Sequence, residues 1–220
     1  MIKLPDFKKS FDYENNFYLS CQPIRIGKLL VHYEIFKKVN SIPGAIVDCG
    51  VFKGSSLVRF AMLRDLFGNN FSKKIIGFDV FGKFPKSKYV DDKKDIRKFV
   101  KEAGNVSISK PQLLKILKNK GLETNVDLVK GDITKTVPKY LKKHPELRIS
   151  LLNLDVDVYE PSVTILEYLY PRIVKGGILL LDDFGFFSGE TQAIEEYFRK
   201  KKIKIKKHAL SMTPAYVIKK

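Results

Sequence analysis

Cysteine is scarce and tryptophan is absent in this chain of 220 residues. The two cysteines, Cys21 and Cys49, cannot build the disulfide framework of a small secreted domain. The opening residues, MIKLPDFKKS, lack the apolar core of a secretory signal. No run of residues approaches the roughly 18 apolar residues that a membrane span needs. We therefore expect a soluble, cytoplasmic protein without a membrane span.

Acidic residues are also few. The chain has 41 lysines and arginines against 24 aspartates and glutamates, a formal net charge of +17. Residues 83–120 hold 12 basic and 4 acidic side chains, and residues 197–220 hold 9 basic and none acidic. This charge either keeps helix faces solvated or attracts an anionic partner, such as a nucleotide, a phosphorylated sugar, nucleic acid or acidic lipid.

The length indicates one domain with room for a full core. The sequence contains no internal repeat, low-complexity segment or Pro/Gly/Ser linker. We predict that residues 1–40 form an N-terminal extension and a helix, over 26–40, that pack on the core. Residues 41–220 then form the main domain, in which the basic stretch 83–120 is a lid or insert.

Short apolar runs alternate with helical patterns along the main domain. We expect strands at 45–47, 74–78, 126–129, 149–154 and 177–181, and closing strands at 202–208 and 215–218. Helices are expected at 55–67, 111–121, 138–143, 162–174 and 191–200. This alternation predicts an α/β protein with a mainly parallel sheet, whose ligands bind outside the carboxyl ends of the strands.

The first strand end reads D-C-G-V-F-K-G-S-S over residues 48–56. Gly50 permits a tight turn that approaches a ligand closely. Gly54 and Ser55 open the next helix, whose free N–H groups attract a carboxylate or phosphate. Asp48 is placed to accept a hydrogen bond from a ligand ammonium. The motif is not the dinucleotide fingerprint G-x-G-x-x-G, because position 52 is Phe. A purely structural strand–turn–helix is therefore the alternative.

Two further acids follow the second and third strands. Asp79 stands where nucleoside-binding α/β folds hold a ribose diol, although an N-cap or surface acid is the alternative. Asp132 is placed to meet an adenine amino group, or else caps the turn before Thr134.

The fourth strand is followed by D-V-D over residues 155–157, and the fifth by Asp182 and Asp183. Adjacent parallel strands bring these carboxylates to one edge, where they repel one another unless a cation is present. Oxygen ligands favour Mg²⁺, Mn²⁺ or Ca²⁺ over Zn²⁺. Helix capping and salt bridges to lysine are the alternative. Asp157 is either a metal-proximal group or a structural acid, and no histidine is assigned a catalytic role.

The strand ends together resemble one family, through IVDCGVFKGSS, IIGFDVF, LVKGD and LNLDVDVYEPSVTILEYLYPRIVKGGILLLDDFG. The chain is similar to macrocin O-methyltransferases (TylF-like) over roughly residues 24–200. The most specific features are D-x-D-x-Y, then L-Y-P-x-x-x-x-G-G and D-D-F-G. The resemblance implies a class I methyltransferase: a Rossmann-like sandwich with a mainly parallel seven-stranded sheet, helices on both faces and a C-terminal antiparallel strand.

The resemblance also implies the chemistry: methylation of a sugar hydroxyl, nucleotide-linked or on a glycan or natural product, with S-adenosylmethionine and Mg²⁺ or Mn²⁺. Asp155 is implied as the catalytic base, and Asp155, Asp182 and Asp183 as metal ligands. The implied cofactor-binding residues are Asp48, Gly50, Val51, Phe52, Gly54, Ser55, Ser56, Asp79, Asp132 and Asp155.

Two other functions stay open at this stage. The net charge suggests an RNA or other nucleic-acid methyltransferase, although the basic tail lacks the interleaved aromatics that stack on bases. The stretch Val80–Pro85 departs from the sequence that is usual in the family at this position, so a degenerate cofactor-binding protein is the other alternative. The residues leave the oligomeric state undecided, whereas the resemblance implies a homo-oligomer.

Overall fold

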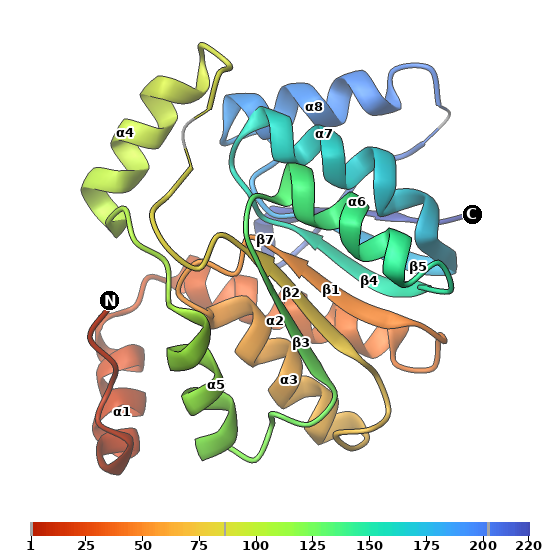
Figure 1. Cartoon of the computed structure of the whole chain (residues 1–220). Coiled ribbons are helices and arrows are strands. Elements are labelled where there is room, and N and C mark those ends of the chain that lie inside the picture. Colours follow the sequence, from red (N-terminus) through yellow and green to blue (C-terminus); the bar gives the residue numbers. More distant parts are fainter. Residues whose placement is uncertain (1, 86, 202) are drawn as a thin grey trace.

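A seven-stranded sheet forms the centre of the computed structural model, which describes residues 2–85, 87–201 and 203–220 (Figure 1). Across the sheet the strands follow the order β3-β2-β1-β4-β5-β7-β6. Their bounds are β1 Ala45–Cys49, β2 Ile75–Asp79, β3 Val126–Lys130, β4 Ile149–Leu154, β5 Ile173–Leu181, β6 Lys206–His208 and β7 Ser211–Ile218.

The first five strands are parallel, β7 runs antiparallel to β5, and β6 runs antiparallel to β7. Every residue of β1, β2 and β4 is buried. Continuous burial is typical of parallel strands that are covered on both faces. The predicted α/β class, the mainly parallel sheet and the antiparallel strand at its C-terminal end are therefore confirmed.

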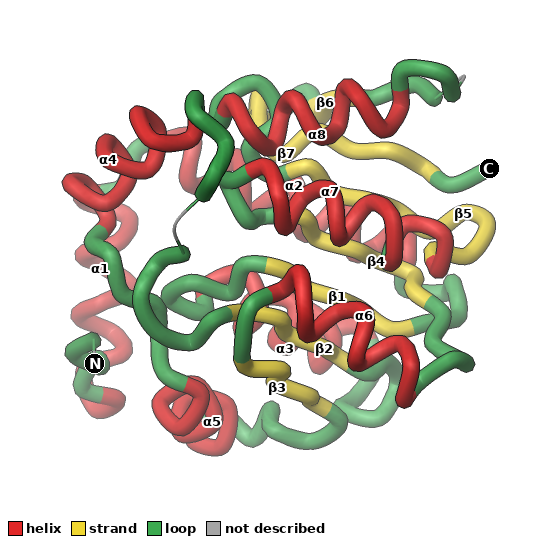
Figure 2. The backbone as a smooth tube through the Cα atoms, turned by 45° about the horizontal axis from the view of Figure 1, so that its top comes forward, coloured by secondary structure: helices red, strands yellow, loops and turns green. Residues whose placement is uncertain are grey.

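Helices cover both faces of the sheet (Figure 2). Apolar side chains of α2, α3 and α5 pack in one core layer, and those of α6, α7 and α8 in the other. None of the helices in the described ranges is long and apolar enough to cross a membrane. The helix bounds are α1 Ser10–Ser20, α2 Pro23–Val39, α3 Ser55–Phe67, α4 Asp92–Ala103, α5 Lys110–Asn119, α6 Ile133–Lys143, α7 Tyr159–Tyr168 and α8 Ser188–Phe198, with 3-10 turns at Phe7–Lys9 and Tyr170–Arg172.

Most predicted elements differ from the observed ones by a few residues at one or both ends, as the next three cases illustrate. The helix expected at 162–174 ends at Tyr168, because Pro171 lies in a 3-10 turn and the chain is already extended at Ile173. The helix expected at 138–143 begins at Ile133, with Asp132 as its N-cap. The strand expected at 202–208 covers only 206–208, and residue 202 lies outside the described residues.

The terminal extension and the basic insert each divide into two parts. Helix α2 packs on the core, but α1 has no buried residue, so the prediction of packing is wrong for α1. Within 83–120, of which residue 86 is not described, α5 packs in the core through Leu113 and Leu117. Helix α4 buries only Asp92. The part suited to a lid is therefore α4 and the loop before it.

Arg64 on α3 is 1% exposed and connects the segments that precede β2 and β3. Its guanidinium donates hydrogen bonds to the carbonyl oxygens of Lys73, Leu122, Thr124 and Asn125. Arg64→Met leaves these buried acceptors without a donor, so we expect the free energy of unfolding to fall by about 3 kcal/mol.

Urea denaturation at constant m-value measures this loss. The matched control is Arg148→Met, because Arg148 is exposed and contacts only the nearby carbonyls of Glu146 and Leu147. Equal stability of the two variants would show that solvent or side-chain rearrangement satisfies the acceptors.

Candidate functional site

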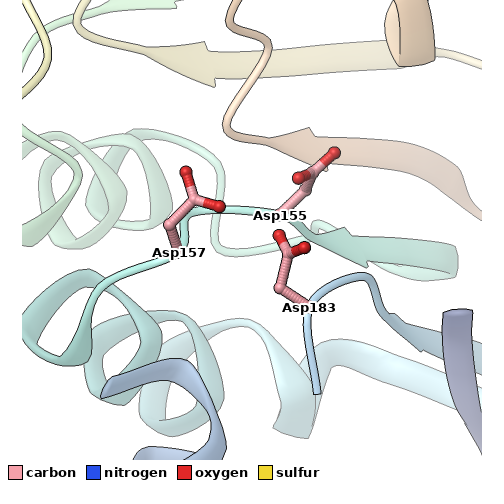
Figure 3. Close-up of side chains that lie close together, drawn as sticks. All are labelled: Asp155, Asp157 and Asp183. Atoms are coloured by element: carbon pink, nitrogen blue, oxygen red, sulfur yellow. The ribbon is translucent and has the colours of Figure 1, made fainter. Parts of the chain in front are cut away.

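Three carboxylates meet at the carboxyl ends of β4 and β5 (Figure 3). Asp155 and Asp157 follow β4, and Asp183 follows β5. One oxygen from each side chain lies within 4.8 Å of the others. We call Asp155, Asp157 and Asp183 the acid cluster.

The strand ladder continues into this edge and fixes the backbone beneath the cluster. The amide of Asp155 donates to Cys49 O at 3.0 Å, and that of Asp182 donates to Leu154 O at 3.0 Å. Asp157 has φ 65°, a left-handed conformation that is uncommon for residues other than glycine. Backbone strain of this kind is frequent at functional sites, where the surrounding structure holds it in place.

Burial raises the pKa of all three cluster carboxyls well above the usual range, and their neighbours raise it further. Next to burial, the largest contribution comes from Asp182 for Asp155 and Asp183, and from Asp155 for Asp157. Carboxylates this close cannot all be ionised without a compensating positive charge. The cluster therefore favours either a proton or a bound cation.

Asp182 points to a different partner. Its Oδ2 lies 2.5 Å from the ammonium Nζ of Lys28 on α2. Its Oδ1 is buried and accepts no hydrogen bond within the described part of the chain. Burial lowers the pKa of Lys28, but the charges of Asp182 and Asp155 outweigh this and hold it above its ordinary value. Of the predicted ligands, the structure thus brings Asp155 and Asp183 together with Asp157, while Asp182 pairs with Lys28.

A second buried brace comes from Glu190 on α8, which is 0% exposed. Its Oε1 accepts from the amide of Asp183 at 3.1 Å, and its Oε2 accepts from the amide of Asp157 at 3.3 Å. The amide of Val156 lies 3.4 Å from the same Oε2. One side chain therefore connects the loops that follow β4 and β5.

The turn between β1 and α3 lies directly against the acid cluster. Gly50 has φ 93°, and a Cβ there would lie 1.5 Å from the carbonyl oxygen of Asp155. Only glycine fits this close approach. Gly54 has φ 90° and precedes α3, where Ser55 is exposed, while Val51 and Ser56 are buried. The predicted cofactor loop and the predicted base are thus neighbours.

Asp48 is completely buried beneath this turn. Ser56 Oγ donates to its Oδ2, and Asn153 Nδ2 donates to its Oδ1, each at 2.8 Å. Burial raises the pKa of Asp48 to about 6, although these two hydrogen bonds act in the opposite direction. Its carboxylate is therefore held in one orientation and titrates close to neutral pH.

The other two predicted nucleoside ligands differ in setting. Asp79 is buried, and its carboxylate accepts hydrogen bonds from the amides of Phe52 at 3.0 Å and Phe81 at 2.5 Å. Asp132 is exposed and caps α6 by accepting from the amide of Thr134 at 3.0 Å. The capping alternative for Asp132 is confirmed, and contacts of either residue with a nucleoside stay predictions.

Helix α4 is attached to the site by its own acidic residues. Asp92 Oδ2 accepts from the amide of Tyr159 at 3.0 Å, and Asp95 Oδ2 accepts from the amide of Ser188 at 3.0 Å. Each acid thus supplies an acceptor at the N-terminal end of a core helix, α7 or α8, where free N–H groups favour negative charge.

The ring of Phe99 on α4 extends this attachment to the cofactor loop. Its centroid lies 5.2 Å from that of Phe52, 5.4 Å from that of Phe84 and 5.9 Å from that of Phe187. These contacts hold α4 over the carboxyl edge as an apolar cover.

Sequence reasoning missed Lys28, Glu190 and the acids of α4. Asp92 and Asp95 stand out as acids that open a helix inside a basic stretch, and this signal was available. Glu190 follows D-D-F-G by only a few residues in the first turn of α8. Lys28 carries no comparable signal, because it is 154 residues from Asp182 in the chain.

Comparison with known proteins gives a consistent result. A family model described as macrocin O-methyltransferase (TylF) matches residues 28–219. A 4'-O-methyltransferase from Streptomyces olivaceus, acting on 8-demethyl-8-(2,3-dimethoxy-alpha-L-rhamnosyl)-tetracenomycin C, is 25% identical over 150 residues. The match covers 66% of this chain and 54% of that protein, so the chain spans about half of this relative.

Solved structures of O-methyltransferases share the fold. The calicheamicin methyltransferase CalS11 has a TM-score of 0.77 and 26% identity, covering 95% of this chain and 85% of its own. The O-methyltransferase NovP has a TM-score of 0.75 and 20% identity, covering 88% and 80%, and supports the fold alone.

Proposed function

The chain belongs to the macrocin O-methyltransferase (TylF) family, and on this premise we propose that it methylates a sugar hydroxyl with S-adenosylmethionine. The observation that carries the proposal is the acid cluster, which adjoins the glycine turn at the carboxyl edge of the sheet. One relative acts on a rhamnosyl group, and another structure of CalS11 is described as a TDP-rhamnose 3'-O-methyltransferase. A deoxysugar, nucleotide-linked or attached to a natural product, is therefore the proposed acceptor class, in a cytoplasmic enzyme.

We further propose that a divalent cation takes part. The donor set fits Mg²⁺ or Mn²⁺, because it consists of carboxylate oxygens within 4.8 Å of one another. Asp155, Asp157 and Asp183 would hold the ion, and the buried Oδ1 of Asp182 is a further candidate ligand. A bound cation would lower the pKa of a sugar hydroxyl, as it does for water.

Asp155, the glycine turn and α4 each have a separate role in the proposed reaction. Asp155 accepts the hydroxyl proton, the sugar oxygen forms a bond to the methyl carbon, and the carbon–sulfur bond breaks to release S-adenosylhomocysteine. The glycine turn, packed against Asp155, would hold the cofactor beside the proposed base, and the cofactor would supply the methyl group. Helix α4 excludes water, which matters because the sulfonium charge disappears during the reaction.

The test is methyl transfer from isotopically labelled S-adenosylmethionine, with Mg²⁺ or with EDTA. The acceptors are thymidine-diphosphate rhamnose, a rhamnoside without nucleotide, and RNA. We expect methylation of a sugar that EDTA prevents. Labelled RNA would support the nucleic-acid alternative and overturn the proposal. Absence of cofactor binding would indicate an inactive relative.

The pH dependence of cofactor binding tests the proposed role of Asp48. We propose that its carboxylate accepts a hydrogen bond from the cofactor ammonium, directly or through water. Because its pKa is raised to about 6, the neutral form predominates below that pH. We expect the affinity for S-adenosylhomocysteine to be about tenfold lower at pH 5 than at pH 7.

Calorimetric titration across this range measures the effect, and Asp48→Asn should flatten the curve. The folding stability of the ligand-free protein should change with pH in the direction opposite to the cofactor affinity. A raised pKa means that the folded state binds the proton more tightly, so Asp48 contributes stability that is lost as pH rises through about 6. A wild-type affinity that does not vary with pH would remove Asp48 from the cofactor site.

A further inference from the structure

Asp182 is paired with a basic residue of α2, and this ion pair is largely shielded from water. The ammonium Nζ of Lys28 lies 2.5 Å from Asp182 Oδ2. The side chain of Asp182 is 4% exposed, and that of Lys28 is 25% exposed. An ion pair at such depth is weak evidence for a contribution to stability, because the removal of both charges from water offsets their attraction. Its clearer effect is to fix the position of Asp182.

The backbone that carries Lys28 is tightly packed. Gly27 precedes it, and a Cβ on Gly27 would lie 2.5 Å from the carbonyl oxygen of Leu210. Helix α2 thus touches the segment before β7 backbone to backbone. Val31 and Ile35 follow Gly27 at intervals of four residues, on the same helix face, and both are 0% exposed. This packing holds α2 in one rotation, so the Lys28 side chain starts from a fixed point.

One turn further along α2, His32 is a buried but neutral neighbour of the pair. Its ring is 0% exposed and stacks on that of Phe60, with centroids 4.9 Å apart. Arg59 Nη1 lies 3.2 Å from His32 Nδ1. Because a guanidinium only donates, Nδ1 accepts, and the imidazole is neutral with its hydrogen on Nε2. Burial lowers the pKa of His32 to about 3, which agrees with a neutral ring. His32 therefore carries no charge that would draw Lys28 away from Asp182.

The two carboxylate oxygens of Asp182 have different settings. Oδ2 accepts from Lys28, whereas Oδ1 is buried and accepts no hydrogen bond within the described part of the chain. The backbone is fixed as well, because the amide of Asp182 donates to Leu154 O at 3.0 Å. A buried acceptor without a donor is costly, so Oδ1 is suited to a ligand that the chain does not supply. Asp183, the next residue, belongs to the acid cluster, and a cation bound there is such a ligand.

The charge of Lys28 is also compatible with a divalent cation. Asp182 and the three members of the acid cluster are four carboxylates, whose charge exceeds that of Mg²⁺ or Mn²⁺ by two. Burial lowers the pKa of Lys28, but Asp182, Asp155 and Asp183 together raise it, so the ammonium lies within electrostatic reach of the cluster. Lys28 therefore offsets part of the excess negative charge. Because it binds Oδ2 of Asp182, it does so without occupying Oδ1.

We propose that Lys28 is a positioning residue for the divalent cation: it holds Asp182 by Oδ2 and leaves Oδ1 as the oxygen available to the ion. The inference rests on the proposed use of a cation at the acid cluster, and it adds the residue that prepares the fourth carboxylate. In this role Lys28 acts only through Asp182, and it contacts neither the cofactor nor the acceptor.

The affinity of the full chain for Mn²⁺, measured by electron paramagnetic resonance without cofactor or acceptor, tests this role. Lys28→Met should weaken Mn²⁺ binding by about 10- to 100-fold, the range expected when a group that orients a metal ligand is lost. Lys28→Arg keeps a charged donor and should recover most of the affinity. The matched control is Lys37→Met, because Lys37 is exposed on the same helix and its Nζ lies over the Tyr33 ring, 6.0 Å from the centroid. That variant loses the same charge and should bind Mn²⁺ like the wild type.

A double-mutant cycle shows whether Lys28 acts through Asp182. Asp182→Asn removes the anionic partner, so the addition of Lys28→Met to this variant should weaken Mn²⁺ binding no further. The double variant leaves neither charge of the pair unpaired, so the comparison holds even if Lys28→Met alone proves unstable. An equal loss from Lys28→Met in both backgrounds would overturn a role that passes through Asp182.

A Lys28→Met variant that binds Mn²⁺ as tightly as the wild type would also overturn the role of Lys28, while leaving the proposed cation in place. Tighter binding by this variant would overturn it too, because Lys28 would then compete with the ion. A wild type that binds no Mn²⁺ would instead remove the proposed cation, and this inference with it. Circular dichroism verifies that each affinity refers to folded protein. Methyl transfer is not part of the measurement, so the identity of the acceptor is tested separately.

Discussion

Asp155→Asn should lower kcat/KM for sugar methylation by about a thousandfold or more. The proposed role of Asp155 combines proton acceptance with metal ligation, and an amide does neither well. The substitution keeps the size of the side chain and the backbone hydrogen bond from Asp155 N to Cys49 O. The affinity for S-adenosylhomocysteine should therefore change far less than turnover.

Initial rates with a sugar acceptor, together with calorimetric titration of cofactor and Mg²⁺, measure the two effects separately. Asp127→Asn is the matched control, because Asp127 on β3 pairs with Lys74, which precedes β2, and has no place in the proposed chemistry. If Asp155→Asn retained wild-type turnover, the proposed base would have to be another member of the cluster. An equal loss of cofactor affinity and turnover would indicate a structural role.

Most of the fold could be predicted, because the parallel strands are short apolar runs separated by helical patterns. Burial on both faces gives such strands a continuous signal. The bounds of α6 and α7 were harder to predict from the sequence. A proline inside α6 argues locally against a helix, yet the N-cap at Asp132 and the packing of Val137 and Leu141 outweigh it.

The location of the site was predictable and its internal pairing was not. Strand ends must converge, so the sequence indicates that Asp155 and Asp183 lie close together. Successive side chains at a strand end point to opposite faces, so Asp182 faces α2 while Asp183 faces the cluster. Lys28, the partner of Asp182, and the left-handed backbone of Asp157 depend on long-range packing that local patterns do not encode.

The docking of α4 and the exposure of α1 also depend on contacts that local sequence patterns do not encode. Net charge identified 83–120 as one basic segment, but the two acids of α4, Asp92 and Asp95, determine where that helix docks. Helix α1 combines polar and aromatic residues, and none of its 11 residues is buried. The prediction that the N-terminal extension packs on the core therefore fails for this helix.

Glu190→Gln should reduce Mg²⁺ affinity and kcat/KM by roughly 10- to 100-fold, the range expected when a group that orients metal ligands is lost. Both oxygens of Glu190 accept hydrogen bonds from backbone amides of the loops that carry Asp157 and Asp183. Burial and the charge of Asp183 raise the pKa of Glu190 well above its usual range, and the hydrogen bonds from these amides act in the opposite direction. Glutamine keeps one acceptor oxygen and replaces the other by an NH₂ donor, which repels the amide that it faces.

Because Glu190 touches neither of the proposed reactants, its effect must pass through the positions of Asp157 and Asp183. A positioning role predicts a loss of Mg²⁺ affinity and of kcat, with the KM for S-adenosylmethionine nearly unchanged. Glu195→Gln, an exposed substitution on the same helix, should leave all three quantities at wild-type values. If Glu190→Gln instead unfolded more easily while binding Mg²⁺ normally, Glu190 would serve the core alone. The carboxylates would then owe their arrangement to the strand ladder that ends at Leu154 and Leu181.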